Sequence, residues 1–277
     1  ALRYSQPSLH TSRKVVFPCS VTAADAALDL TRGLLWLHIA VFLRVGPAIF
    51  LFPGLGESTV PVRVKLVLAL LITIFTAPAV ALWIPPEATN SGGVFWLVLS
   101  ETAIGLLIGL GVRLFVMALQ TAGSIAGQST SLSHILGSAG VTPLPAIGHF
   151  LVIGGLALVM ILGLHVRAIQ MVILTYGIFP VGVLPEASSV GQWGMRQVAG
   201  AFALAFTLAA PFVIVSVLYN LTLGIINRAM PQLMVVFVGA PVITGLGLLF
   251  LFLLAPTMLS IWTHALEGFL TNPLGGR

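Results

Sequence analysis

The sequence predicts an all-α membrane protein with about six kinked hydrophobic helices, a re-entrant middle loop and a C-terminal helical hairpin. Hydrophobic residues make up 58% of its 277 residues, and charged residues only 7%. A soluble domain carries about 25% charged residues, so this chain has too little charge to coat a water-facing surface. Apolar runs of about 18 residues or more recur, each long enough to cross about 30 Å of hydrocarbon. No run alternates strictly between apolar and polar residues, which argues against membrane strands.

The first three spans are predicted at residues 33–55, 66–83 and 93–119. The fourth region contains two apolar stretches, 150–164 and 168–183, and reads either as two spans or as one span plus a half-span. Two long runs follow, and a helix over the second would measure about 45 Å, longer than the hydrocarbon core. Such a helix must tilt, kink or project beyond the lipid. These last two runs cover residues 198–223 and 233–262, and prolines that could kink the spans stand at 47, 78, 211, 241 and 256.

Between the last two runs lies a short polar interruption, residues 224–232, which ends in Asn227, Arg228, Ala229, Met230, Pro231 and Gln232. It is too short for a domain and too polar for the middle of a bilayer. We therefore expect it to join two membrane-scale helices as a tight hairpin.

The ends and the middle of the chain differ in composition from the spans. Residues 1–24 lack the periodicity of the rest, and we expect them to be disordered or spurious. Residues 120–147 are rich in hydroxyl groups and glycine and contain no Lys, Arg, Asp or Glu. They are either a loop folded into a central passage as a plug, or an exposed loop between spans three and four, because such backbone sits at membrane depth only where it lines protein or water.

Two pairs of glycines are spaced four residues apart, and this spacing places both members on one helix face. In a membrane helix it allows another backbone to approach closely, although glycine is also generally frequent in such helices. The pairs are Gly105 with Gly109, and Gly123 with Gly127.

Four charged residues fall within or at the edges of the predicted spans: Arg44, Glu101, Arg113 and Arg167. A charge at the bilayer centre costs about 2.5–3.5 kcal/mol on insertion scales. Arg44 and Glu101 lie deeper in their runs, and we expect Glu101 to pair with a basic group such as Arg44. Arg113 and Arg167 either snorkel to an interface or face other subunits or a wet cavity.

Composition also excludes several classes of function. The net charge of +5 comes from only 12 Lys and Arg against 7 Asp and Glu, and the basic residues are scattered singly, which argues against nucleic-acid binding and favours lipid headgroups as acidic partners. Cys19 is the only cysteine, so an intrachain disulfide or a cysteine metal cluster is excluded. We find no nucleophile–base arrangement, phosphate loop or dinucleotide fingerprint. The sequence therefore predicts no enzyme, no cofactor and no metal site.

Several motifs together resemble the FliR family of type III secretion export-gate proteins, which includes the T subunit of injectisomes. The hairpin from Asn220 to Pro241, with Asn-Arg-Ala-Met-Pro-Gln at its bend, is the most specific of them. Supporting stretches are Arg44-Val-Gly-Pro, Pro53-Gly-Leu-Gly, the Gly123–Gly127 segment with its following serines, and Gly163-Leu-His-Val-Arg. They keep the family's order over about residues 30–265, and the bend is closer to the flagellar branch.

This resemblance implies a subunit of the flagellar export gate in the bacterial inner membrane, at the flagellar basal body. It implies FliP-like and FliQ-like membrane subunits and other export-apparatus proteins as partners, with unfolded polypeptides as cargo. Residues 25–190 would form a FliP-like part and residues 191–277 a FliQ-like hairpin. Implied plug residues are Gly123, Gly127, Ser129, Ser131, Ser133, Gly137 and Gly140; implied interface or structural residues are Arg44, Glu101, Gly105, Gly109, Asn227, Arg228, Pro231 and Gln232. A multispan secondary transporter or channel subunit, with Arg44 and Glu101 at a midplane ion site, is the alternative.

Overall fold

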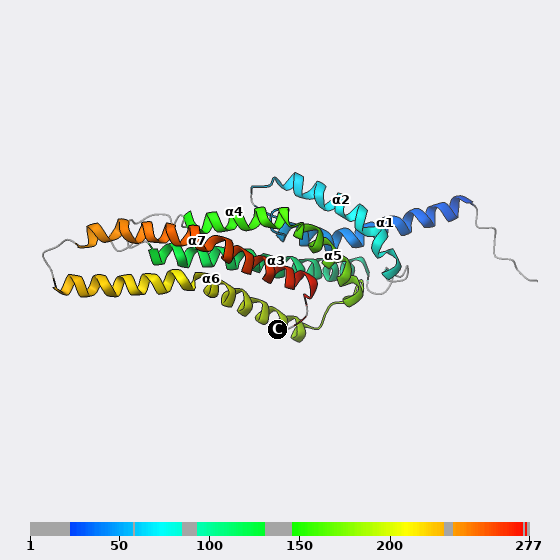
Figure 1. The fold of residues 1–277 in the computed structure, drawn as a ribbon. Coiled ribbons are helices and arrows are strands. Elements are labelled where there is room, and N and C mark those ends of the chain that lie inside the picture. The colour runs from blue at the N-terminus through cyan, green and yellow to red at the C-terminus, as the bar shows by residue number, and fades with distance from the viewer. Residues whose placement is uncertain are drawn as a thin grey trace, which may run out of the picture.

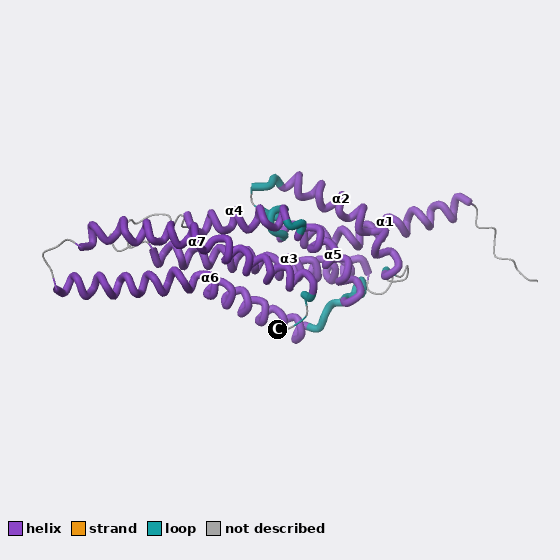
Figure 2. The backbone as a smooth tube through the Cα atoms, in the orientation of Figure 1, coloured by secondary structure: helices purple, strands orange, loops and turns teal. Residues whose placement is uncertain are grey.

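The described part of the chain is all helical and forms one elongated bundle (Figures 1 and 2). The computed structural model describes residues 23–57, 59–84, 93–130, 146–229, 235–273 and 275. The helices are α1 (Ala23–Leu51), α2 (Val62–Val80), the 3₁₀ turn η1 (Ala81–Trp83), α3 (Gly93–Thr130), α4 (Ala146–Ile161), α5 (Leu164–Ile178), α6 (Ala187–Ala229) and α7 (Val235–Thr271).

Five of these helices are long and apolar enough to cross a membrane, and α4 with α5, bent by 71°, is by the same criterion the candidate for a sixth, broken span. The prediction of about six spans is therefore confirmed. The break falls at Gly163, whose φ of +68° lies in the left-handed region that glycine tolerates without a Cβ clash. One broken span accounts for the two apolar stretches of the fourth region.

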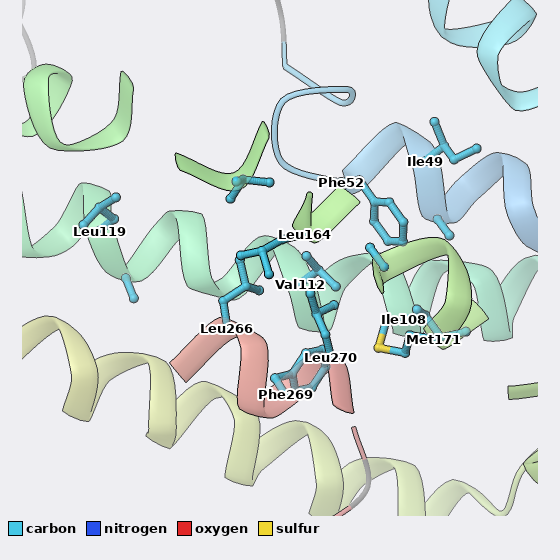
Figure 3. Close-up of a cluster of buried hydrophobic side chains, with 14 of the residues drawn as sticks. Ile49, Phe52, Ile108, Val112, Leu119, Leu164, Met171, Leu266, Phe269 and Leu270 are labelled. Atoms are coloured by element: carbon cyan, nitrogen blue, oxygen red, sulfur yellow. The ribbon is translucent and has the colours of Figure 1, made fainter. Parts of the chain in front are cut away.

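The helix α3 lies at the centre of the bundle and contacts α1, α4, α6 and α7, while α2 packs on the outer side of α1 (Figure 1). Their shared core is apolar, and Figure 3 shows part of it. Trp262 of α7 is fully buried, and its indole N–H donates to the carbonyl oxygen of Phe115 in α3 at 2.8 Å. Labelled members of this core are Ile49, Phe52, Ile108, Val112, Leu119, Leu164, Met171, Leu266, Phe269 and Leu270.

Both predicted boundaries of the middle loop are wrong, because the helices on either side extend into it. Residues 120–130, which we expected in the middle loop, form the last three turns of α3, and residues 146–147 begin α4. The segment contains no proline before residue 143, and its small residues pack against the bundle: Ala122, Gly123, Ala126 and Gly127 are all buried. The alanines and glycines therefore mark close packing here rather than a loop. The rest of the predicted loop, residues 131–145, lies outside the described residues.

The hairpin bend is also shorter than expected. Residues 224–229 continue α6 and do not form the bend, because they contain no proline and the next one is Pro231. Pro231 and Gln232 lie outside the described residues, as do residues 1–22 of the segment we expected to be disordered or spurious; residues 23–24 belong to α1.

Candidate functional site

The ion pair expected between Arg44 and Glu101 is present, and it lies in the interior of the bundle. The Arg44 guanidinium donates from Nε to Oε2 of Glu101 at 2.8 Å and from Nη2 to Oε1 at 3.1 Å. Both side chains are fully buried. This two-bonded geometry is the strongest arrangement available to an arginine and a carboxylate, and it compensates two charges that have lost their water.

Three groups from α5 and the turn after it complete the pair. Nη2 of Arg44 also donates to the carbonyl oxygen of Phe179 at 3.0 Å, and Nη1 lies 3.5 Å from the Thr175 hydroxyl. The Gly182 N–H donates to Oε1 of Glu101 at 3.1 Å. The pair therefore fastens the end of the broken span to α1 and α3.

An aromatic ring covers the same guanidinium. The carbon at the centre of the Arg44 guanidinium lies 3.8 Å from the centroid of the Tyr176 ring, within cation–π distance. The buried charge thus meets a carboxylate, a carbonyl and a π-face, all from the chain itself.

Glycine lets the two helices that carry the ion pair come close together. A Cβ atom on Gly105 would overlap the carbonyl oxygen of Arg44, and one on Gly109 would lie 2.9 Å from the Cβ of Leu51 and 3.1 Å from the Cα of Ala48. Real Cβ atoms essentially never lie under 3.0 Å from another heavy atom, and 3.1 Å is tighter than nine in ten real Cβ contacts. The predicted close approach at this glycine pair is therefore the contact between α3 and α1.

The first glycine of the second pair has the same role farther along α3. A Cβ on Gly123 would overlap the Cα of Gly148 in α4. Gly123 and Gly127 are both buried within α3. They lie in a packed helix, as does the half-buried Ser129, whose hydroxyl donates to the Ala126 carbonyl oxygen at 2.8 Å. The other predicted plug residues, Ser131, Ser133, Gly137 and Gly140, lie outside the described residues.

The other two arginines in the spans are also paired, which the sequence did not indicate. Arg113 of α3 donates to Glu57, in the turn after α1, at 2.5 Å, with the two side chains 24% and 18% exposed. Arg167 of α5 pairs with Glu267 of α7 at a more exposed position. Each arginine therefore has a glutamate partner within the chain, which snorkelling to an interface does not account for.

The carboxyl end of α3 is held by a residue of α6. The Ser216 hydroxyl donates to the carbonyl oxygen of Ser129 at 2.5 Å, and the Asn220 side-chain amide donates to the Ser216 hydroxyl at 3.2 Å. The last carbonyls of a helix have no partner within the helix, so this bond satisfies one of them from outside. Neither α6 residue was predicted, because nothing in its local sequence indicates a partner 87 residues away.

At the far end of α6, Asn227 and Arg228 are both exposed. Arg228 lies in the last turn, where a cation interacts favourably with the negative end of the helix dipole. Among the described residues, no group of three or more His, Cys, Asp or Glu side chains is placed to hold a metal ion.

The arrangement is thus a set of internal charge pairs and close helix contacts. Comparison with known proteins shows which family the chain resembles. The model of the bacterial export proteins, family 1, matches residues 35–269. The flagellar biosynthetic protein FliR of Caulobacter vibrioides is 35% identical over 230 residues, covering 80% of this chain and 90% of that protein.

More distant relatives agree over similar lengths. The flagellar biosynthetic protein FliR of Escherichia coli K12 is 28% identical over 239 residues, covering 84% of this chain and 90% of that protein. The protein of the same name from Aquifex aeolicus is 25% identical over 230 residues, with coverage of 82% and 88%. By the match of its family model and by these relatives, the chain belongs to the bacterial export proteins, family 1.

Proposed function

We propose that this chain, a membrane component of the flagellar type III export apparatus in the bacterial inner membrane, forms part of the export gate. In this role it lines the pore through which unfolded substrate proteins pass, together with FliP-like and FliQ-like membrane subunits. It acts by steric obstruction and positioning and carries out no chemical reaction.

The observation that carries this proposal is the length of the exposed apolar stripe on α6. The stripe runs from Met195, which is 68% exposed, to Ile225, which is 64% exposed. Thirty helical residues measure about 45 Å, against about 30 Å of hydrocarbon. For a straight helix at the average tilt of about 20°, this length still corresponds to about 42 Å along the membrane normal. Lipid can cover only part of it, so the remainder requires protein. Between the two ends the stripe includes Val198, Phe202, Phe206, Ile214, Val217, Leu218 and Leu221.

The shape of α6 and α7 supports the same conclusion. In Figure 1 the two helices extend beyond the other helices at one end of the bundle, and α6 changes direction partway along its length. Pro211 lies within α6 and supplies the usual cause of such a kink. A projecting, kinked apolar hairpin suits an assembly that leaves the plane of the bilayer. We assign residues 191–277 to a FliQ-like hairpin and residues 25–190 to a FliP-like part.

We further propose that the stretch after α3, residues 131–140, obstructs the pore at rest. It follows the α3 terminus that Ser216 holds at Ser129, and it includes Ser131, Ser133, Gly137 and Gly140. Glycine permits the change of backbone conformation that displacement by an extended polypeptide requires. The interface roles of Asn227, Arg228, Pro231 and Gln232 belong to the same proposal.

Deletion of residues 131–138 tests the plug. In cells that express the complete export apparatus, we expect the deletion to let the membrane leak ions, measured by a membrane-potential dye. The matched control removes residues 86–91, between α2 and α3, and should not leak. Equal permeability of both variants, with the variant chain still isolated together with its partner subunits, contradicts the plug.

Isolation of the chain from membranes tests the assembly separately. We expect two different small membrane proteins to accompany it, identified by native mass measurement of the complex. A chain that is isolated alone and transports a solute in vesicles would support the alternative, a secondary transporter. The buried pair argues against that alternative, since Arg44 and Gly182 already occupy the Glu101 carboxylate.

A further inference from the structure

An apolar cavity with one charged group at its rim lies at the end of the bundle where α6 begins. Its volume is about 260 Å³, and it opens between α3, α5, the start of α6 and the end of α7. Ile108, Met171 and Phe269, which line it, are labelled in Figure 3. A second, larger groove of about 510 Å³ runs from this point along α6 and shares Trp193, Arg196 and Phe269 with the cavity.

The polar groups in the cavity wall are few, and two of them are already engaged. The Thr175 hydroxyl donates to the carbonyl oxygen of Val172, and the Ser189 hydroxyl donates to Glu186. Among the described residues that line the cavity, Arg196 alone is charged. An apolar cavity offers water too few partners, so it stays dry or takes up hydrocarbon.

In the described ranges, Arg196 lacks the glutamate partner that three arginines of the bundle have. Arg44, Arg113 and Arg167 each pair with a glutamate of the chain. Within the part of the chain that the structure describes, Arg196 has no carboxylate within ion-pair distance. An anion attached to a hydrocarbon chain would supply both the counter-charge for this guanidinium and the apolar group that fills the cavity.

The wall beside Arg196 is held by contacts with α3 and with the end of the chain that follows α7. The Trp193 indole N–H donates to the carbonyl oxygen of Pro273 at 2.8 Å, and the ring lies against Phe269 with centroids 6.5 Å apart. Both rings approach α3 at Gly111, where a Cβ would lie 2.7 Å from Phe269 and 3.0 Å from Trp193. Tryptophan is enriched at the membrane–water interface, and arginine is one of the residues that anchor helices there.

We infer that this cavity and groove bind one phospholipid with an anionic headgroup. The lipid phosphate pairs with the guanidinium of Arg196, one acyl chain enters the cavity, and the other lies in the groove along α6. Charge complementarity at Arg196 and the apolar lining of the cavity select a lipid over a free phosphate, which would leave the cavity empty. This inference does not depend on the pore or on the plug.

The test measures the lipid that stays with the protein. The chain is isolated with its partner subunits in a mild detergent, and native mass spectrometry counts the phospholipids retained per complex. We expect one tightly held phosphatidylglycerol or cardiolipin. Arg196→Gln should lower its retention about fivefold, which corresponds to the roughly 1 kcal/mol that one arginine contributes to binding an anionic lipid surface. Arg196→Lys should largely restore retention, and Arg32→Gln, in an exposed part of α1, should leave it unchanged.

A second variant tests the cavity itself with the arginine in place. Val190→Trp places a large side chain in the cavity wall and should expel the acyl chain, whereas Val198→Trp, on the exposed stripe, should not. Retention equal to the original chain in both Arg196→Gln and Val190→Trp would overturn the inference. So would a photo-crosslinker at position 190 that joins only to a protein subunit and never to a lipid.

Discussion

Neutralising Glu101 while keeping its shape is the most direct test of how the bundle tolerates its buried charges. In Glu101→Gln, the guanidinium of Arg44 keeps its hydrogen bond to the Phe179 carbonyl but loses its only counter-charge in the described network. Removing one partner of a buried ion pair costs about 3–5 kcal/mol, because a charge is left without compensation. We expect a loss of stability of that size.

The double variant Arg44→Met/Glu101→Gln separates the charge from the shape. Both charges are then absent, and the amide oxygen of Gln at position 101 can still accept from Gly182. The Phe179 carbonyl and the Thr175 hydroxyl lose the donor that Arg44 supplied, and the buried amide N–H groups of Gln at position 101 need an acceptor, each at about 1–3 kcal/mol if left unsatisfied. No buried charge is left without compensation, so the double variant should lose less stability than the roughly 6–10 kcal/mol of two independent losses.

Unfolding of the purified chain by SDS titration, followed by tryptophan fluorescence, measures these differences, since the chain contains five tryptophans. Conditions, detergent and protein concentration are held constant across the four proteins. If the double variant loses as much stability as the two single variants together, the two charges are not coupled and the reasoning is refuted. The reasoning is also refuted if Glu101→Gln is as stable as the original chain.

Other predictions compare each variant with a control position in the bundle. Gly105→Ala should destabilise the bundle by more than about 2 kcal/mol through overlap with the α1 backbone, whereas Gly200→Ala, with open space at its Cβ, should be neutral or stabilise by up to about 1 kcal/mol in the same unfolding assay. Ser216→Ala should increase hydrogen exchange of the last turn of α3 and cost about 1 kcal/mol, and Thr222→Ala, whose hydroxyl bonds within its own helix, should do neither. Arg113→Gln, at a partly exposed pair, should cost no more than about 1 kcal/mol and less at high salt; a loss matching that of Glu101→Gln would contradict the role assigned to burial.

The sequence is informative where a physical requirement leaves few solutions. Two charges deep in apolar runs require partners, so the pairing of Arg44 with Glu101 follows from the positions of these residues along the chain. Glycines at the spacing of Gly105 and Gly109 predict a close helix contact, and that contact is present. Both inferences depend on local features of the chain.

The features that the sequence does not reveal depend on distant parts of the chain or on context. The groups of Phe179 and Gly182 that complete the ion pair are backbone atoms, which carry no residue-specific signal. The polarity of residues 120–130 favours a loop, but a helix buried between neighbours accepts small hydroxyl residues. The sequence predicts that Arg113 and Arg167 either snorkel to an interface or face other subunits or a wet cavity. Their glutamate partners, Glu57 and Glu267, follow only from the packing of the helices.

The position of the central ion pair also bears on how the protein is made. Arg44 precedes its counter-charge by 57 residues and the Phe179 carbonyl by 135. As the ribosome delivers the chain, the cation enters the membrane machinery before Glu101 exists, and its last ligand emerges only with α5. Biogenesis must therefore hold the first helix in a hydrated or sheltered setting until later helices arrive, and release it to lipid as part of a group.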